Sequence, residues 1–188
     1  MATAGSACLG RRAGAHARSC GPSLRSGVAG KISPRLAEIV EALPLRPGMR
    51  VLEIGCGPGA AARAVLHRIG RGRVLAIDRS PTAIAAAMAG SVAELATGQL
   101  EFRCVALEDL VLPGGEPRYD LAFAVRVGAL DGRHPEAGRH AFERLGHVLV
   151  RGGSLFIDGG DPLVEMRLAP TGHAFESMPI RGAPRFRH

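Results

Sequence analysis

Residues 51–59 read VLEIGCGPG, an apolar run that leads into three glycines spaced two residues apart. The run from Arg50 to Ile54 predicts a short buried strand, and the apolar spacing in 59–69 predicts a helix directly after the glycines. Gly55 allows a tight turn, Gly57 lets a ligand approach the backbone closely, and Gly59 leaves the helix start free of a side chain. The unpaired N–H groups of such a helix start favour a carboxylate or a phosphate. The stretch therefore predicts an anion-binding strand–loop–helix unit.

Strand and helix patterns alternate along the rest of the chain. The predicted strands are 50–54, 73–77, 101–105, 119–127 and 154–158, and the predicted helices are 34–43, 59–69, 81–89 and one that begins at Pro135 and ends at Gly152-Gly153. Such alternation predicts an α/β fold, a doubly wound and mostly parallel sheet with helices on both faces. Segments 163–168 and 174–180 predict a hairpin with no full helix before it, which gives the fold a shortened C-terminal end.

The length of 188 residues predicts one domain with a tail. Residues 1–30 show no hydrophobic period and predict a disordered basic tail, which leaves residues 31–188 for the domain. The net charge is +7, but residues 1–31 hold five basic residues and no acid, and three arginines follow Glu176. The body between these ends therefore carries a net charge of −1. A nucleic-acid-binding protein usually carries its basic face on the folded body, so the charge does not indicate one here.

The four cysteines, Cys8, Cys20, Cys56 and Cys104, show no CxxC spacing. Neither a disulfide framework nor a zinc site is therefore predicted, and a reducing cytoplasmic location is expected. No run of about 18 apolar residues is present, so we expect no membrane span.

Two acidic residues help to identify the ligand of the glycine loop. The glycines also fit the dinucleotide pattern Gly55-x-Gly57-x-x-Ala60, which alone is a weak signal. Glu53 lies two residues before the first glycine, where its charge opposes a pyrophosphate and favours the ammonium of an amino-acid group, directly or through water. Asp78 ends the second strand, 21 residues after Gly57, at a distance suited to ribose hydroxyls. Glu53 therefore argues against the dinucleotide interpretation, and Asp78 indicates a ribose.

These motifs resemble those of class I S-adenosylmethionine-dependent methyltransferases, which have a Rossmann-like fold. VLEIGCGPG is similar to their first motif and VLAIDRSP (residues 74–81) to their ribose-binding strand end, and the likeness extends over about residues 33–160. The resemblance implies S-adenosylmethionine as the cofactor. It implies cofactor contacts from Glu53, Gly55, Cys56, Gly57, Gly59, Asp78, Arg79, Leu107, Glu108 and Val125.

Within this resemblance, the glycine loop and Glu53 serve the methionine end, Asp78 serves the ribose, and Arg79 flanks the adenine. The family often has an acidic residue followed by a small one after the third strand, where it binds the adenine amino group. This chain has Ala106-Leu107 there, so the backbone of Leu107 or the side chain of Glu108 is the expected substitute.

The acceptor side is expected after the fourth strand. Arg126 closes that strand and can bind an acidic acceptor or the cofactor carboxylate, and the alternative is an ion pair with Asp120, Asp131 or Asp158. Asp131 and His134 can form a general-base pair, and the alternative is an ordinary polar loop. A metal site is not expected. His140, Glu143 and His147 share one helix face, which favours a solvated surface.

The predicted function is methyl transfer from S-adenosylmethionine to an acceptor that the protein holds in line with the methyl group. The protein then contributes mainly proximity and orientation. No Asn/Asp-Pro-Pro-Tyr/Phe or Pro-Cys motif of nucleic-acid methylation is present, which favours a small-molecule acceptor by elimination. A homodimer is a possible source of the missing acceptor pocket. The alternatives are an NAD(P)-dependent oxidoreductase, which Glu53 disfavours, and an S-adenosylmethionine-binding protein without catalysis.

Overall fold

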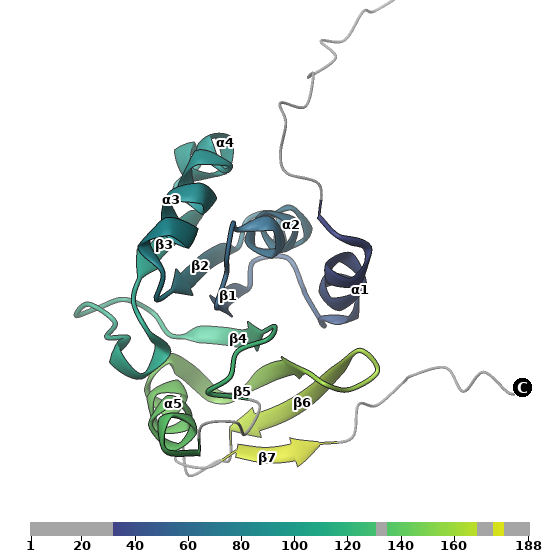
Figure 1. Ribbon diagram of the computed structural model, residues 1–188, viewed down its shortest axis with the longest axis vertical. Helices are drawn as coiled ribbons and strands as arrows, with labels where there is room; N and C mark the ends of the chain where they lie inside the picture. Colours follow the sequence, from purple (N-terminus) through teal and green to yellow (C-terminus); the bar gives the residue numbers. More distant parts are fainter. Residues whose placement is uncertain (1–31, 131–134, 169–174, 179–188) are drawn as a thin grey trace, which may run out of the picture.

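The computed structural model describes residues 32–130, 135–168 and 175–178, and these contain a seven-stranded sheet in the order β3-β2-β1-β4-β5-β6-β7. The first five strands pair in parallel, whereas β6 is antiparallel to β5 and β7 is antiparallel to β6 (Figure 1). The strands are β1 (Arg50–Ile54), β2 (Arg73–Asp78), β3 (Leu100–Cys104), β4 (Tyr119–Ala124), β5 (Leu149–Asp158), β6 (Leu163–Leu168) and β7 (Phe175–Met178). The predicted α/β fold is confirmed.

The helices predicted at 34–43, 59–69 and 81–89 are present, with boundaries within one residue of those predicted. The helices are α1 (Pro34–Ala42), α2 (Ala60–Ile69), α3 (Pro81–Ala89), α4 (Val92–Ala96) and α5 (Pro135–Val148), with a short 3₁₀ helix η1 (Leu107–Asp109). Ser33 and Ser80 cap α1 and α3, since their hydroxyls accept the N–H groups of Leu36 and Ala83, both at 3.3 Å. In the described part of the chain, no helix has the length and apolar character needed to cross a membrane.

Helices cover both faces of the sheet, with α1, α2 and α3 on one side and α5 with η1 on the other (Figure 1). Successive residues of a strand point to opposite faces, so Val51 packs beneath α2 while Leu52 packs toward α5. Both residues are fully buried, as expected for a parallel strand that is covered on both faces. This layering leaves the carboxyl ends of the parallel strands, and the loops that follow them, as the place where a ligand can enter.

Three predicted boundaries are wrong: the end of the fourth strand, the end of the last helix, and the start of the fifth strand, which is Leu149 instead of residue 154. The fourth strand ends at Ala124 instead of residue 127, because Arg126 has a φ of +59° and turns the chain out of the sheet. The last helix ends at Val148 instead of at the glycine pair 152–153, which lies inside β5. The pairing of β4 with β5 shifts its register between Tyr119 and Leu121, and Gly152 has a φ of +74° in this irregular part of the strand.

Other expectations agree more closely. The third strand is displaced by one residue from its predicted position, and the predicted hairpin is present as β6 and β7. The sequence pattern did not indicate α4 or η1. The predicted tail, residues 1–30, lies outside the described residues.

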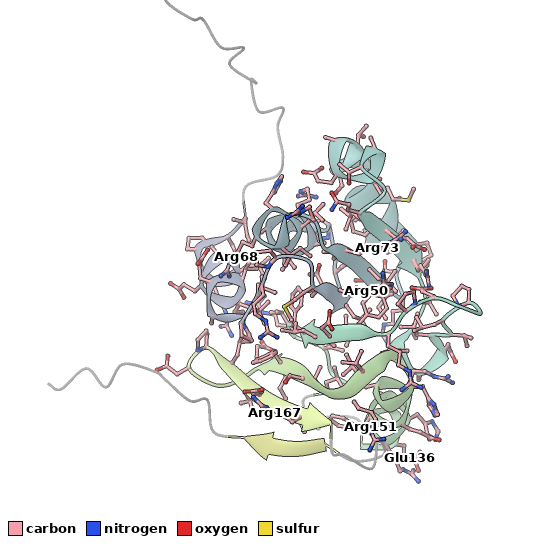
Figure 2. The ribbon with its side chains drawn as sticks, turned by 180° about the vertical axis from the view of Figure 1, so that it is seen from behind. Arg50, Arg68, Arg73, Glu136, Arg151 and Arg167 are labelled. Carbon is pink, nitrogen blue, oxygen red and sulfur yellow. The ribbon has the colours of Figure 1, made fainter. Side chains whose placement is uncertain are left out.

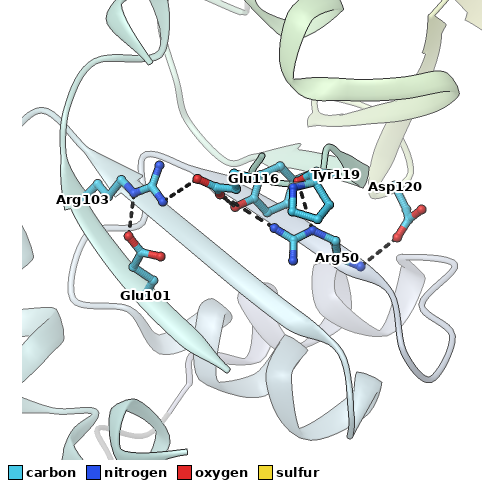
Figure 3. A network of polar contacts seen from close by, with 7 residues as sticks. Arg50, Glu101, Arg103, Glu116, Tyr119 and Asp120 are labelled. Carbon is cyan, nitrogen blue, oxygen red and sulfur yellow. Dashed lines mark hydrogen bonds and ion pairs between the residues drawn. The ribbon is translucent and has the colours of Figure 1, made fainter. Parts of the chain in front are cut away.

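A polar network fastens the loop before β4 to the sheet (Figure 3). Glu116 accepts hydrogen bonds from the Tyr119 hydroxyl at 2.6 Å and from Arg103 at 2.9 Å, and Arg50 lies 3.7 Å from it. Arg103 also donates to Glu101 at 2.6 Å, while the Arg50 guanidinium lies 4.9 Å from the centre of the Tyr119 ring. Although burial alone would raise it, the hydrogen bonds from Tyr119 and Arg103 hold the pKa of Glu116 below its usual value. The network therefore fixes the end of the β3–β4 loop that leads into β4, away from η1.

Candidate functional site

A cavity of about 820 Å³ opens where β1, β2, β3 and β4 end. This volume lies within the range of small-molecule sites, roughly 300–1,000 Å³. The wall is formed by Ile54, Gly55, Ile77, Asp78, Arg79, residues 105–108, residues 125–129, Glu136 and Ala137. Of the residues predicted from the sequence, the structure brings Gly55, Asp78, Arg79, Leu107, Glu108, Val125 and Arg126 together on this wall.

The glycine loop is held against β2 and against the end of β4. The N–H groups of Gly55 and Cys56 donate to the carbonyl of Ile77 at 2.8 and 3.0 Å. A Cβ on Gly55, whose φ is +72°, would lie only 2.7 Å from a methyl group of Val127. Glycine is therefore required here by both the backbone conformation and the close approach of the chain after β4.

Asp78 ties the glycine loop to the start of α3. One carboxylate oxygen accepts the N–H of Gly57 at 2.9 Å, and the other accepts the N–H of Ser80 at 2.8 Å. The side chain is half-buried and lines the cavity. Since a carboxylate has about four lone-pair sites and only two are used here, it keeps acceptor capacity for ribose hydroxyls.

Glu53 lies behind the loop and does not form part of the cavity wall. Its side chain is buried, with 5% of the residue exposed, and one carboxylate oxygen has no hydrogen-bond partner among the residues that the structure describes. Burial raises the pKa of Glu53 to about 8, although a hydrogen bond from the backbone of Ala62 and the nearby Arg63 charge act to lower it. The unpartnered oxygen can take a further donor, so the site is suited to a cationic group or a water molecule next to the loop.

Three other loop residues also lie off the cavity wall. Gly59 begins α2 with a φ of +74°, and a Cβ there would lie 2.8 Å from the Phe102 ring, so its role in the structure is packing. Gly57 has a φ of +52° and open space around the position of a Cβ. Burial raises the pKa of the Cys56 thiol above its usual value, which disfavours the thiolate and a nucleophilic role.

The wall beyond Asp78 is formed by Arg79 and by η1. Arg79 is exposed, Leu107 is buried, and Glu108 is half-buried on the cavity wall. The backbone carbonyl of Glu108 accepts a hydrogen bond from Arg144 of α5 at 3.2 Å, which fixes η1 against that helix. No acid stands at Ala106, so the carboxylate available at this end of the cavity is that of Glu108 or Asp78.

The chain after β4 forms the opposite wall of the cavity. The backbone N–H of Arg126 donates to Asp158 at 2.9 Å, and the other oxygen of Asp158 lies 3.7 Å from Arg35. Asp120 instead accepts the backbone N–H of Arg50 at 2.8 Å. In the ranges 32–130, 135–168 and 175–178, no carboxylate pairs with the guanidinium of Arg126, so the alternative of an ion pair with Asp120 or Asp158 is not observed.

Asp131 and His134 lie outside the described residues. Glu136, an exposed residue in the first turn of α5 (Figure 2), is instead the carboxylate that lines this side of the cavity. The sequence pattern did not indicate Glu136 or residues 127–129 as part of the site. The available signal for Glu136 was its position one residue after Pro135, at a helix start that faces the strand ends.

Arg63 was also missed by the sequence analysis. It lies on α2 with 6% of the residue exposed, and it donates to the carbonyl of Pro58 at 3.2 Å and to the hydroxyl of Ser91 at 2.8 Å. The sequence gives one indication of this role, which is that a charged residue stands at a core-facing position of the helix.

The three α5 residues His140, Glu143 and His147 line a smaller groove with Glu108, Asp109 and Arg144. Among the residues that the structure describes, no group of histidine, cysteine and acidic side chains has an arrangement that could hold a metal ion.

Known proteins resemble this chain over its central part. Residues 51–153 match the family model described as a methyltransferase domain. The protein-L-isoaspartate O-methyltransferase of Methylorubrum populi is 37% identical over 129 residues, which make up 68% of this chain and 52% of that protein. The ribosomal RNA large subunit methyltransferase E of Acidithiobacillus ferrooxidans is 39% identical over 75 residues, 37% of this chain and 34% of that protein. The chain thus spans about half or less of the length of these relatives.

A solved structure with a similar fold is that of the cyclase SpnF. It has a TM-score of 0.53 and 27% sequence identity, and the match covers 65% of this chain and 43% of that one.

Proposed function

We propose that this chain, which belongs to the class I S-adenosylmethionine-dependent methyltransferase family, transfers a methyl group from S-adenosylmethionine to a small-molecule acceptor. One observation carries the proposal. A single cavity joins Gly55 and Asp78, the residues expected to hold the cofactor, to residues 125–129 and Glu136 on the far wall. Cofactor and acceptor can therefore bind next to each other in one cavity.

The residues around the cavity fit the family's cofactor. Asp78 has free acceptor capacity for a ribose, and Glu108 offers a carboxylate near the place expected for an adenine amino group. The unpartnered oxygen of Glu53 lies behind the loop at the amino-acid end, where a positive charge would lower the free energy of its ionised form. The family match favours this cofactor over the nicotinamide alternative.

The bound cofactor supplies an electrophilic methyl group on a sulfonium. The chain's contribution is then mainly to bind, orient and exclude water, which can account for a large part of a rate enhancement. Val125, Val127 and Ala129 give an apolar surface beside the glycine loop. Glu136 is the carboxylate on that side that can accept a proton from an acceptor hydroxyl or amine.

A small acceptor agrees better with the body of the protein than a nucleic acid does. The segment 32–176 carries a net charge of −1, so its basic and acidic residues nearly balance, although Arg50 and Arg73 are neighbours where β1 and β2 begin (Figure 2). A nucleic-acid surface would be expected to concentrate such charges. The relatives carry names that refer to protein and to ribosomal RNA, so these two acceptor classes are the alternatives to test.

Two measurements test the proposal. Calorimetric titration with S-adenosylmethionine, S-adenosylhomocysteine and NADH should show binding of the first two alone. The protein is then incubated with cofactor carrying a tritiated methyl group and with a cell extract separated into small-molecule, protein and RNA fractions. Label transferred to the small-molecule fraction is expected. Label in protein or RNA would contradict the acceptor class, and binding without transfer to any fraction would favour a non-catalytic binding protein.

A further inference from the structure

Arg126 occupies an unusual position on the cavity wall. Among the residues that the structure describes, it is the one non-glycine residue with positive φ, at +59°. Such a conformation disfavours a side chain by about 1 kcal/mol or more. Its backbone N–H is fixed by Asp158 at 2.9 Å, so the strained conformation is held by a specific contact from β5. Strain that is maintained in this way at a cavity suggests a role for the side chain.

The strand order places Arg126 at one end of an elongated ligand. The sheet runs β3-β2-β1-β4, so the cavity wall passes from η1 after β3, to Asp78 at the end of β2, to Gly55 after β1, and then to Arg126 after β4. Ile54 pairs with Ile77 on one side and with Ala124 on the other, which puts β1 between Asp78 and Arg126. A ligand whose ribose lies at Asp78 and whose base lies toward η1 extends its remaining part toward Arg126.

Arg126 is the arginine on this side of the cavity wall, which also carries the carboxylate of Glu136. The wall carries two arginines, Arg79 beside Asp78 and Arg126 across β1 from it. The guanidinium of Arg126 is exposed, and no carboxylate of the described residues pairs with it. A guanidinium presents a planar fork of donors that matches the two oxygens of a carboxylate.

We propose that Arg126 binds the carboxylate of the cofactor's amino-acid group, an inference that rests on the proposed function. Asp158 then acts as a positioning residue, since it holds the backbone turn from which Arg126 projects. The competing role, recognition of an anionic group on the acceptor, would leave cofactor affinity independent of Arg126.

The test compares two cofactors that differ only in the carboxylate. The affinities of the full chain and of Arg126→Gln for S-adenosylmethionine and for its decarboxylated analogue are measured by calorimetry. The substitution should weaken the binding of S-adenosylmethionine about tenfold. This is the lower end of the range for a charge-assisted hydrogen bond, because Arg126 is exposed. The affinity for the analogue should change less than about twofold. Arg79→Gln is the matched control, because it removes the same charge from the same wall. It should change both affinities by equal factors.

The outcomes separate the two proposals. If the unaltered chain binds neither compound, the proposed function fails. If it binds both, and Arg126→Gln weakens both equally or neither, the assignment of Arg126 is overturned while the proposed function stands. Arg126→Gly, which also relieves the positive φ, gives a second variant in case Arg126→Gln folds poorly. It should show the same selective loss for S-adenosylmethionine.

Discussion

Glu53 offers a direct test of the electrostatics of this site, because its carboxyl group is buried and one of its oxygens has no hydrogen-bond partner within the described part of the chain. We predict that Glu53→Gln makes the ligand-free protein more stable at neutral pH. Glutamine has nearly the same shape, keeps a carbonyl oxygen for the N–H of Ala62, and does not ionise. The substitution therefore removes the burial of a titratable acid and leaves the packing nearly unchanged.

The magnitude follows from the pKa of Glu53, which is 4.5 in an ordinary environment and about 8 in the folded protein. The folded state holds the proton more tightly than the unfolded state does, so wild-type stability falls as the pH rises from about 4.5 to about 8. At about 1.36 kcal/mol per pH unit, the interval from 4.5 to 7 corresponds to a loss of about 3 kcal/mol. The stability gain in Glu53→Gln should therefore be close to zero below about pH 4.5, about 3 kcal/mol at pH 7, and constant above about pH 8.

Urea denaturation of both proteins at about pH 5 and pH 7.5, without ligand, measures this difference. Glu38→Gln is the control, since Glu38 is an exposed acid on α1 and its replacement should have little effect at either pH. If the stability difference between Glu53→Gln and wild type is the same at both pH values, the argument from burial is refuted.

Three further predictions concern the loop and the cavity wall. Asp78→Ala should weaken S-adenosylmethionine binding at least about tenfold by calorimetry, because it removes the ribose acceptor and the contact to Gly57, and unchanged affinity would exclude the ribose assignment. Gly59→Ala should destabilise the protein by at least about 2 kcal/mol in urea, since its Cβ meets the Phe102 ring, whereas Gly57→Ala, with open space, should lose only about 1 kcal/mol. Equal losses would argue against the Phe102 contact. Arg126→Gly should raise the thermal midpoint by relieving about 1 kcal/mol or more of backbone strain, while Arg126→Ala, which keeps a Cβ, should not. Identical midpoints for the two would show that the turn is unstrained.

The half of the site that surrounds the glycine loop could be predicted because its determinants are local in sequence. Gly55 and Asp78 lie on a strand–loop–helix–strand unit of fewer than 30 residues, and each conformation there has its own residue signal. The caps at Ser33 and Ser80 are similarly local, since a hydroxyl directly before a proline contacts an N–H three residues later.

The wall after β4 could not be predicted in the same way, because its geometry depends on residues far apart in the chain. An apolar run from 119 to 127 predicts a continuing strand, and nothing near Arg126 in sequence indicates its positive φ. The turn is fixed by Asp158, 32 residues later, and by the contact between Val127 and the loop at Gly55. Similarly, β5 begins at Leu149 through pairing with Tyr119, which overrides the tendency of Gly152 to end regular structure.

The position of Glu53 connects the stability of the protein with ligand binding at the glycine loop. A folded protein that keeps a carboxyl group where burial raises its pKa to about 8 holds it at a cost in stability, and one of its oxygens has no donor in the described structure. A cationic group or an ordered water next to the loop would supply that missing interaction, so ligand binding should recover part of the lost stability. Local destabilisation that a ligand relieves is expected at a binding site and has no purpose in a packing position, where Gln or Leu would serve better. The burial of Glu53 is therefore itself an argument that the loop from Gly55 to Gly59 binds a ligand.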